Sequence, residues 1–94
     1  MAAVCGVGHA DVPHCSPMVR AGGIASVLVE FRAVSCRTHH NSGHVLPAIP
    51  ICVGHTAPIG SASTTVFAGG LGVGRVGDPT CTAVAEGCST VFAG

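Results

Sequence analysis

Six cysteines and six histidines are the residues of this 94-residue chain that could do chemistry. All of them fall in segments rich in Gly, Ser, Thr and Pro, which we expect to be loops at residues 5–24, 35–62 and 77–88. Neutral imidazole and thiolate are the usual ligands of Zn²⁺. If the three loops meet at one end of the fold, these side chains make a zinc site. The loops hold, in order, Cys5, His9, His14 and Cys15; then Cys36, His39, His40, His44, Cys52 and His55; then Cys81 and Cys88.

The spacing of these residues leaves other interpretations open. No zinc-finger pattern matches, because the chain has no pair of cysteines separated by two residues. Each histidine could instead lie on the surface, and each cysteine could be an inert buried thiol. Pairs such as Cys36 with His55 could act as nucleophile and base, but pairs of this kind arise by chance where both residue types are so frequent. With only four carboxylates in the chain, we expect no enzyme.

Composition excludes several classes of protein. Four Arg balance four acidic residues, so the formal net charge is zero and only 9% of residues are charged, which excludes a basic nucleic-acid surface. Gly, Pro, His and Ser interrupt every apolar run far below the length of a membrane span. No signal peptide is recognisable, so we expect synthesis in the cytoplasm, where cysteines remain thiols or bind metal. Three disulfides in an exported miniprotein are the alternative.

Internal repetition indicates how the loops are positioned. Residues 65–69 and 90–94 both read Thr-Val-Phe-Ala-Gly, and residues 25–31 are a weaker copy in which Val27, Val29 and Phe31 alternate on one face. These are strand patterns. With fourteen Gly, six Pro and few strong helix formers, the chain is predicted to be one all-β domain of three loop-then-strand units. The Gly-rich stretch 69–74 predicts a tight hairpin between the strand over residues 63–69 and Arg75-Val76. A phosphate loop is disfavoured because its glycines lack the required spacing.

A series of short motifs in residues 55–94 carries a resemblance to a known family. The motifs are Thr65-Val66-Phe67, a Gly-rich turn, Gly74-Arg75-Val76-Gly77-Asp78-Pro79, Cys81 and Ser89-Thr90-Val91-Phe92. They resemble the PAAR-repeat proteins, whose repeats contain Pro-Ala-Ala-Arg followed by Gly-Asp. Residues 5–54 are similar more loosely: Gly8-His9 stands for Gly-Asp, and Ser26-Val27-Leu28-Val29 for the first strand. The middle copy, residues 31–37, has no Gly-Asp pair.

The resemblance implies a fold and a partner. PAAR proteins are small conical β domains with pseudo-threefold symmetry and a structural zinc ion near the apex. The broad base sits on the blunt end of a trimeric β-helical spike, one copy per spike, in a type VI secretion system or a contractile phage tail. The implied role is a piercing tip that meets the target envelope only transiently. It would be located at a virion tail tip or secreted through a type VI apparatus.

The resemblance also implies a ligand set of three His and one Cys. The positions that match are His14, His40, His55 and Cys81. His9 is an alternative to His14, His39 and His44 are alternatives to His40, and Cys36 or Cys52 could replace a histidine. A single domain over residues 1–94 without a fused effector is expected. The alternative function is a free-standing zinc- or redox-binding module.

One expectation concerns stability. Because zinc would replace a core at the narrow end, Cys81→Ser is expected to lower thermal stability sharply. The same change at Cys5 or Cys88 is expected to matter little.

Overall fold

The fold consists of short antiparallel strand pairs. The computed structural model describes residues 2–13, 17–48 and 51–94, in which no helix occurs. Its strands are β1 (Ala2–Ala3), β2 (Ile24–Val29), β3 (Arg32–Val34), β4 (His44–Ala48), β5 (Ile51–His55), β6 (Phe67–Ala68), β7 (Leu71–Gly72) and β8 (Phe92–Ala93). They form the pairs β1–β8, β2–β3, β4–β5 and β6–β7. The predicted all-β class is confirmed, and the described residues contain no helix that could cross a bilayer.

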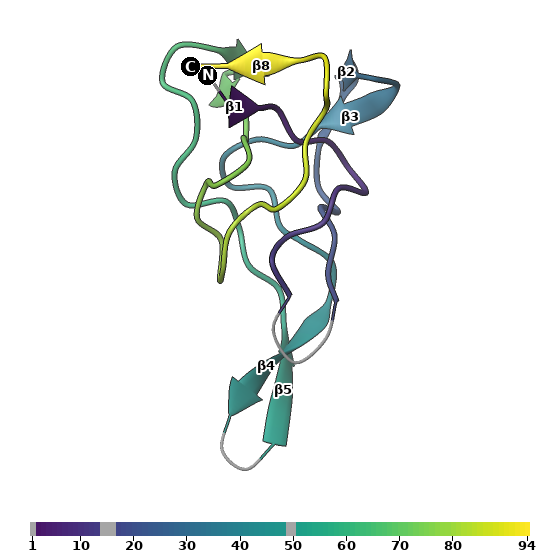
Figure 1. Cartoon of the computed structure of the whole chain (residues 1–94), viewed down its shortest axis with the longest axis vertical. Helices are drawn as coiled ribbons and strands as arrows, with labels where there is room; N and C mark the ends of the chain where they lie inside the picture. The colour runs from purple at the N-terminus through teal and green to yellow at the C-terminus, as the bar shows by residue number, and fades with distance from the viewer. Residues whose placement is uncertain (1, 14–16, 49–50) are drawn as a thin grey trace.

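Three of these pairs lie together at the wide end of an elongated molecule, and β4–β5 extends from the narrow end (Figure 1). The principal extents are 41 × 23 × 21 Å. The β6–β7 pair is a tight hairpin that turns through Gly69 and Gly70, with φ of 57° and 79°. The predicted hairpin exists, but its second strand is Leu71–Gly72 and not the predicted Arg75-Val76. The β2–β3 pair turns in the same way through Glu30 and Phe31, at 48° and 67°. The third pair, β1–β8, joins the two ends of the chain.

Residues 2–11, 32–41 and 71–80 repeat one backbone pattern, and we call them repeats one, two and three. Each begins as one strand of a wide-end pair and continues into a turn. The turn residue with positive φ is Gly8, Thr38 or Gly77, at 93°, 76° and 93°. The next residue donates its amide to the carbonyl three residues earlier in all three repeats. The middle copy therefore keeps the turn without a Gly-Asp pair, because Thr38 and His39 take those two places.

Backbone hydrogen bonds close a ring between the repeats. The amide of Cys5 donates to the carbonyl of Gly74, Gly74 donates to Ser35, and Ser35 donates to Cys5, with N···O distances of 3.0, 2.8 and 3.1 Å. A second cycle of three follows two residues later: Val7 to Ala33, Arg37 to Gly72, and Val76 to Ala3. Each repeat thus makes the same contacts with both of its neighbours. The three repeats are related by a pseudo-threefold axis.

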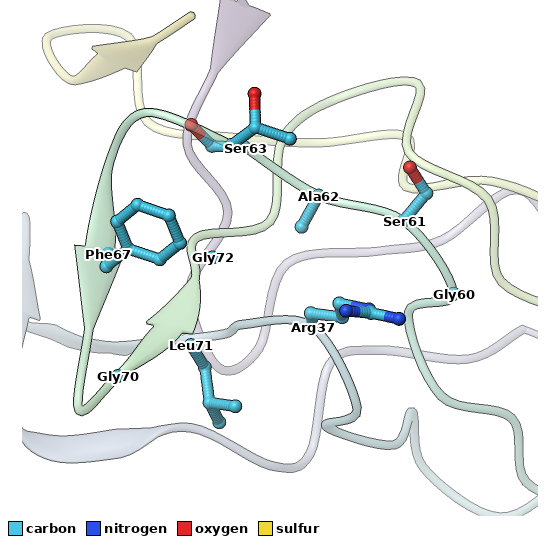
Figure 2. Close-up of a pocket in the computed structure, with 10 residues that line it drawn as sticks. Arg37, Gly60, Ser61, Ala62, Ser63, Phe67, Gly70, Leu71 and Gly72 are labelled. Atoms are coloured by element: carbon cyan, nitrogen blue, oxygen red, sulfur yellow. The ribbon is translucent and has the colours of Figure 1, made fainter.

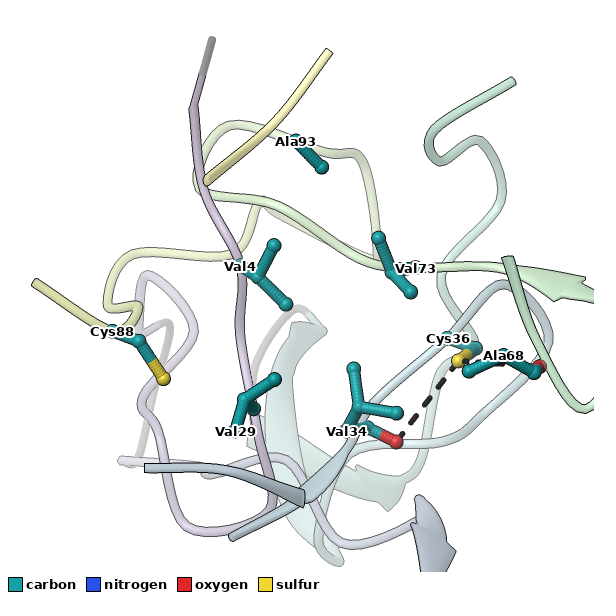
Figure 3. Packing of buried hydrophobic residues seen from close by; sticks show 8 residues of the cluster. All are labelled: Val4, Val29, Val34, Cys36, Ala68, Val73, Cys88 and Ala93. Atoms are coloured by element: carbon teal, nitrogen blue, oxygen red, sulfur yellow. Dashed lines mark hydrogen bonds between the residues drawn. The ribbon is translucent and has the colours of Figure 1, made fainter. Parts of the chain in front are cut away.

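The core packs around this axis. Val4, Val34 and Val73 occupy equivalent positions and are at most 4% exposed. They pack with Val29, Ala68 and Ala93, from the strands that pair with the starts of the three repeats (Figure 3). A second set of equivalent residues accepts, through backbone carbonyls, hydrogen bonds from the amides of the three turn residues with positive φ. Its members are Arg20, Ile59 and Val84, each at most 1% exposed. Small apolar side chains suffice to fill this core because backbone hydrogen bonds connect the repeats.

Several predictions about the elements are wrong. The second loop is not free of regular structure, because β4 and β5 form a hairpin inside it and carry His44, Cys52 and His55. The proline at position 47 argues against a strand, but a two-stranded hairpin has free edges where a missing N–H is tolerated. The Thr-Val-Phe-Ala-Gly copies form strand only at Phe-Ala. Phe31 lies in a turn, 98% exposed, and does not share a face with buried Val29.

Candidate metal centre and wide-end surface

The predicted zinc ligands lie on different segments of the chain. Cys81 is exposed in the loop after repeat three. His40 is exposed, and its Nδ1 lies 2.9 Å from Oγ1 of Thr56. His55 ends β5, where its backbone pairs with that of His44 in β4. His14 lies outside the described residues. Among the residues that the structure does describe, no group of three or more His, Cys, Asp or Glu is placed to hold a metal, so this ligand set stays a prediction.

The three loops do converge at one buried amide side chain. The Nδ2 of Asn41 donates to Oδ2 of Asp11 at 3.0 Å and to Sγ of Cys81 at 3.7 Å. Its Oδ1 accepts the amide of Ala57 at 2.8 Å. Asn41 is 1% exposed. Its hydrogen bonds join the end of repeat one to the loops that follow repeats two and three. The side chains that meet here are an amide, a carboxylate and the thiol of Cys81, where the sequence predicts imidazoles and a thiolate.

A buried ion pair lies beside this junction. Arg20 and Asp11 are 0% and 1% exposed, and Nε of Arg20 is 3.4 Å from Oδ1 of Asp11. Arg20 occupies the place that Ile59 and Val84 fill in the other two units. Burying two charges carries a large desolvation penalty, which offsets much of the attraction between them, so the pair is weak evidence for added stability. The sequence gives only a general signal for this pair, namely two charged residues in a chain that has very few.

Side chains close the three equivalent turns. Nδ1 of His9 accepts the amide of Gly6, and Nδ1 of His39 accepts the amide of Cys36, both at 2.9 Å. The carboxylate of Asp78 accepts the amide of Arg75 at 2.8 Å and also pairs with the Arg75 guanidinium. Burial, with nearby Arg32 for His9 and Arg20 for His39, lowers the pKa of both histidines. Neutral imidazole accepts through Nδ1 only when Nε2 carries the proton, so the turn fixes the tautomer.

Three of the cysteines are core residues. Cys5, Cys36 and Cys88 are each 0% exposed. Burial raises the pKa of all three thiols, that of Cys5 to about 12. They are the inert buried thiols that the sequence left open as an alternative. Their burial revises the expectation for Cys5→Ser and Cys88→Ser: each should cost about 1–3 kcal/mol, because a buried hydroxyl is unfavourable unless it finds a partner.

The wide end presents large apolar side chains at three equivalent positions. Leu28, Phe67 and Phe92 precede the last residue of β2, β6 and β8, and they are 59%, 59% and 50% exposed. The next residues, Val29, Ala68 and Ala93, point into the core. Each strand thus turns a small residue inward and a large apolar residue outward. Exposed apolar side chains gathered in this way mark an interaction surface.

Comparisons with known proteins add no relative. No protein-family model matches the chain, and no curated protein matches it.

Proposed function

We propose that this chain is a structural tip that caps the blunt end of a trimeric β-helical spike in a contractile injection machine. The observation that carries the proposal is the repetition of one exposed apolar position by Leu28, Phe67 and Phe92 around a pseudo-threefold axis. A partner with true threefold symmetry offers the same surface three times. One copy of this chain would satisfy all three subunits.

The wide end also offers backbone groups to such a partner. Its three strand pairs contain only two strands each. Carbonyls of β1, β3 and β7 already accept amides from neighbouring repeats, so the edges open to a further strand are those of β2, β6 and β8. Free edges attract further strands. A β-helical partner ends in strands that could continue these pairs, which would cover both the edges and the three apolar side chains.

The narrow end is where we place the structural zinc. The donors there are of the kind that zinc prefers, and we propose His14, His40, His55 and Cys81 as the set. Nδ1 of His40 is hydrogen-bonded to Thr56, which leaves Nε2 available to bind a metal. Histidine ligands commonly have their other ring nitrogen held by a hydrogen bond in this way. The pairing of His44 with His55 supports His44 as the alternative. When bound, zinc would supply folding free energy by joining distant loops.

The test of the proposal is the stoichiometry of a complex. The chain is mixed with a candidate trimeric β-helical spike protein from the organism that encodes it, and the molar mass of the complex is measured by light scattering. We expect one copy per three spike subunits. Phe67→Glu with Phe92→Glu should abolish the complex. The matched control is Val12→Glu, at an apolar position 44% exposed on the loop leading away from the wide end.

Two results would refute the proposal: three copies bound per trimer, or equal loss of binding in the control variant. The alternative of a redox module finds little support in the three buried thiols, because the thiolate is the reactive form and burial disfavours it.

A further inference from the structure

A cavity of about 300 Å³ lies beside the β6–β7 hairpin. Its walls are the segment 60–64, the β6–β7 hairpin and the side chain of Arg37 (Figure 2). This volume is at the lower end of the range for small-molecule sites. It accommodates a group about as large as one amino-acid residue.

Arg37 brings a positive charge to the cavity that the fold does not use. Arg20 pairs with Asp11, Arg75 pairs with Asp78, and Arg32 donates to a backbone carbonyl. Within the described part of the chain, the guanidinium of Arg37 has no such partner. The equivalent residues of repeats one and three are Val7 and Val76, so the repeat does not require a cation at this position.

The rest of the lining is complementary to a carboxylate that carries an apolar group. No Asp or Glu lines the cavity, and exposed Ser61 and Thr64 contribute hydroxyl groups. Phe67 and Leu71 form an apolar wall. In Figure 2 the guanidinium of Arg37 is directed to the Gly60–Ser61 side, and Phe67 and Leu71 lie on the other side.

Backbone hydrogen bonds hold these walls in place. The amide of Arg37 donates to the carbonyl of Gly72 at 2.8 Å, and the amide of Ser63 donates to that of Val73 at 3.0 Å. A Cβ atom at Gly72 would lie 2.2 Å from the carbonyl oxygen of Ser63, so only glycine permits this close approach. A ligand would therefore meet a preformed site, which reduces the conformational entropy lost on binding.

We propose that this cavity binds a carboxylate attached to an apolar group of the size of one side chain. The guanidinium of Arg37 would hold the two carboxylate oxygens, a geometry for which arginine is well suited. The apolar group would lie against Phe67 and Leu71. The C-terminal residue of a polypeptide and a free carboxylic acid share this chemistry. The proposal does not depend on the spike-tip function.

The test is a titration of the full-length ¹⁵N-labelled chain followed by NMR. The probe is N-acetyl-L-phenylalanine, and its uncharged amide is the matched control. We expect shifts centred on the amides of Gly60, Gly70 and Gly72, and at least about tenfold weaker binding of the amide, the ratio of a lost charge-assisted hydrogen bond. Arg37→Met should lose binding to a similar extent, and Arg37→Lys should lose less. Arg32→Met removes one charge elsewhere and should bind like the unmodified chain.

Two further probes distinguish the sources of the carboxylate. An acetylated peptide that ends in Gly-Phe with a free carboxylate represents a polypeptide C-terminus, and 3-phenylpropionate represents a free acid. Tighter binding of the peptide identifies a polypeptide end as the ligand, whereas equal binding identifies the free acid. Equal affinity for acid and amide probes, or unchanged binding by Arg37→Met, would overturn the proposal, as would a failure of every probe to shift the cavity amides.

Discussion

The ring of hydrogen bonds at the pseudo-threefold axis makes Gly74 the residue whose substitution tests the architecture most directly. Cys5, Ser35 and Gly74 occupy equivalent positions on this ring, and only the third lacks a side chain. A Cβ atom at Gly74 would lie 2.6 Å from Cδ1 of Ile59, 2.9 Å from Sγ of Cys5 and 2.9 Å from the carbonyl oxygen of Ser35. Two of these neighbours are side chains, but the third is backbone and belongs to the ring itself.

Gly74→Ala should therefore destabilise the fold as overpacking does, by about 2 kcal/mol. In a domain of this size that corresponds to a fall in the melting temperature of about 10 °C. The assay is thermal and urea unfolding followed by far-ultraviolet circular dichroism. Gly43→Ala is the matched control, because a Cβ atom there meets nothing within 4 Å, and it should leave stability unchanged or slightly raise it.

A double-mutant cycle with Cys5→Ala sharpens the test. Removing Sγ of Cys5 relieves one of the three close contacts, so Gly74→Ala should cost about 0.5–1 kcal/mol less in that background. If Gly74→Ala is no more harmful than Gly43→Ala, the three repeats do not meet as described. If the two substitutions at the ring are strictly additive, their side chains do not share the space on the axis.

Three other predictions follow from the turns and the loops. Folding lowers the pKa of His9, so as the pH falls the unfolded chain takes up a proton at this histidine before the folded chain does. The contribution of His9 to stability should therefore be complete above about pH 6.5 and be lost progressively below it. His9→Asp, which copies the turn of Asp78, should reduce this acid loss in melting curves, and an unchanged pH profile would contradict the role of the histidine. Phe31→Gly should raise stability by about 0.5–1 kcal/mol in urea unfolding, because φ of 67° strains a residue with a side chain; a loss of stability would mean that the exposed ring packs on the fold. Cys81→Ser should reduce both bound zinc, measured by elemental analysis, and melting temperature, whereas Cys88→Ser should lower the melting temperature and keep the metal; full zinc in Cys81→Ser would exclude this thiol as a ligand.

The candidate site shows how far sequence reasoning reached. The loops converge at Asn41, as expected, but of the residues that meet there only Cys81 was predicted. The hydrogen bond between Asn41 and Asp11 joins residues far apart in the chain, and their spacing in the sequence does not reveal it. Arg20 replaces an apolar residue of the repeat, and a substitution of that kind is visible only once the three units are superposed in space. His9 and His39 close turns through Nδ1, a role that their spacing from Gly6 and Cys36 does not reveal.

The residue types alone determined that the chain is all-β and repetitive, because Val and Thr favour extended backbone, frequent Gly and Pro end each strand early, and two copies of one pentapeptide must adopt similar conformations. Only the tertiary structure decided that the last strand pairs with the first, that the repeats donate hydrogen bonds in a closed cycle, and that β4 and β5 form the narrow end. The physical reason is that these contacts join residues far apart in the chain. Local preference sets the conformation of a segment, but only the packing of all three repeats selects its partner.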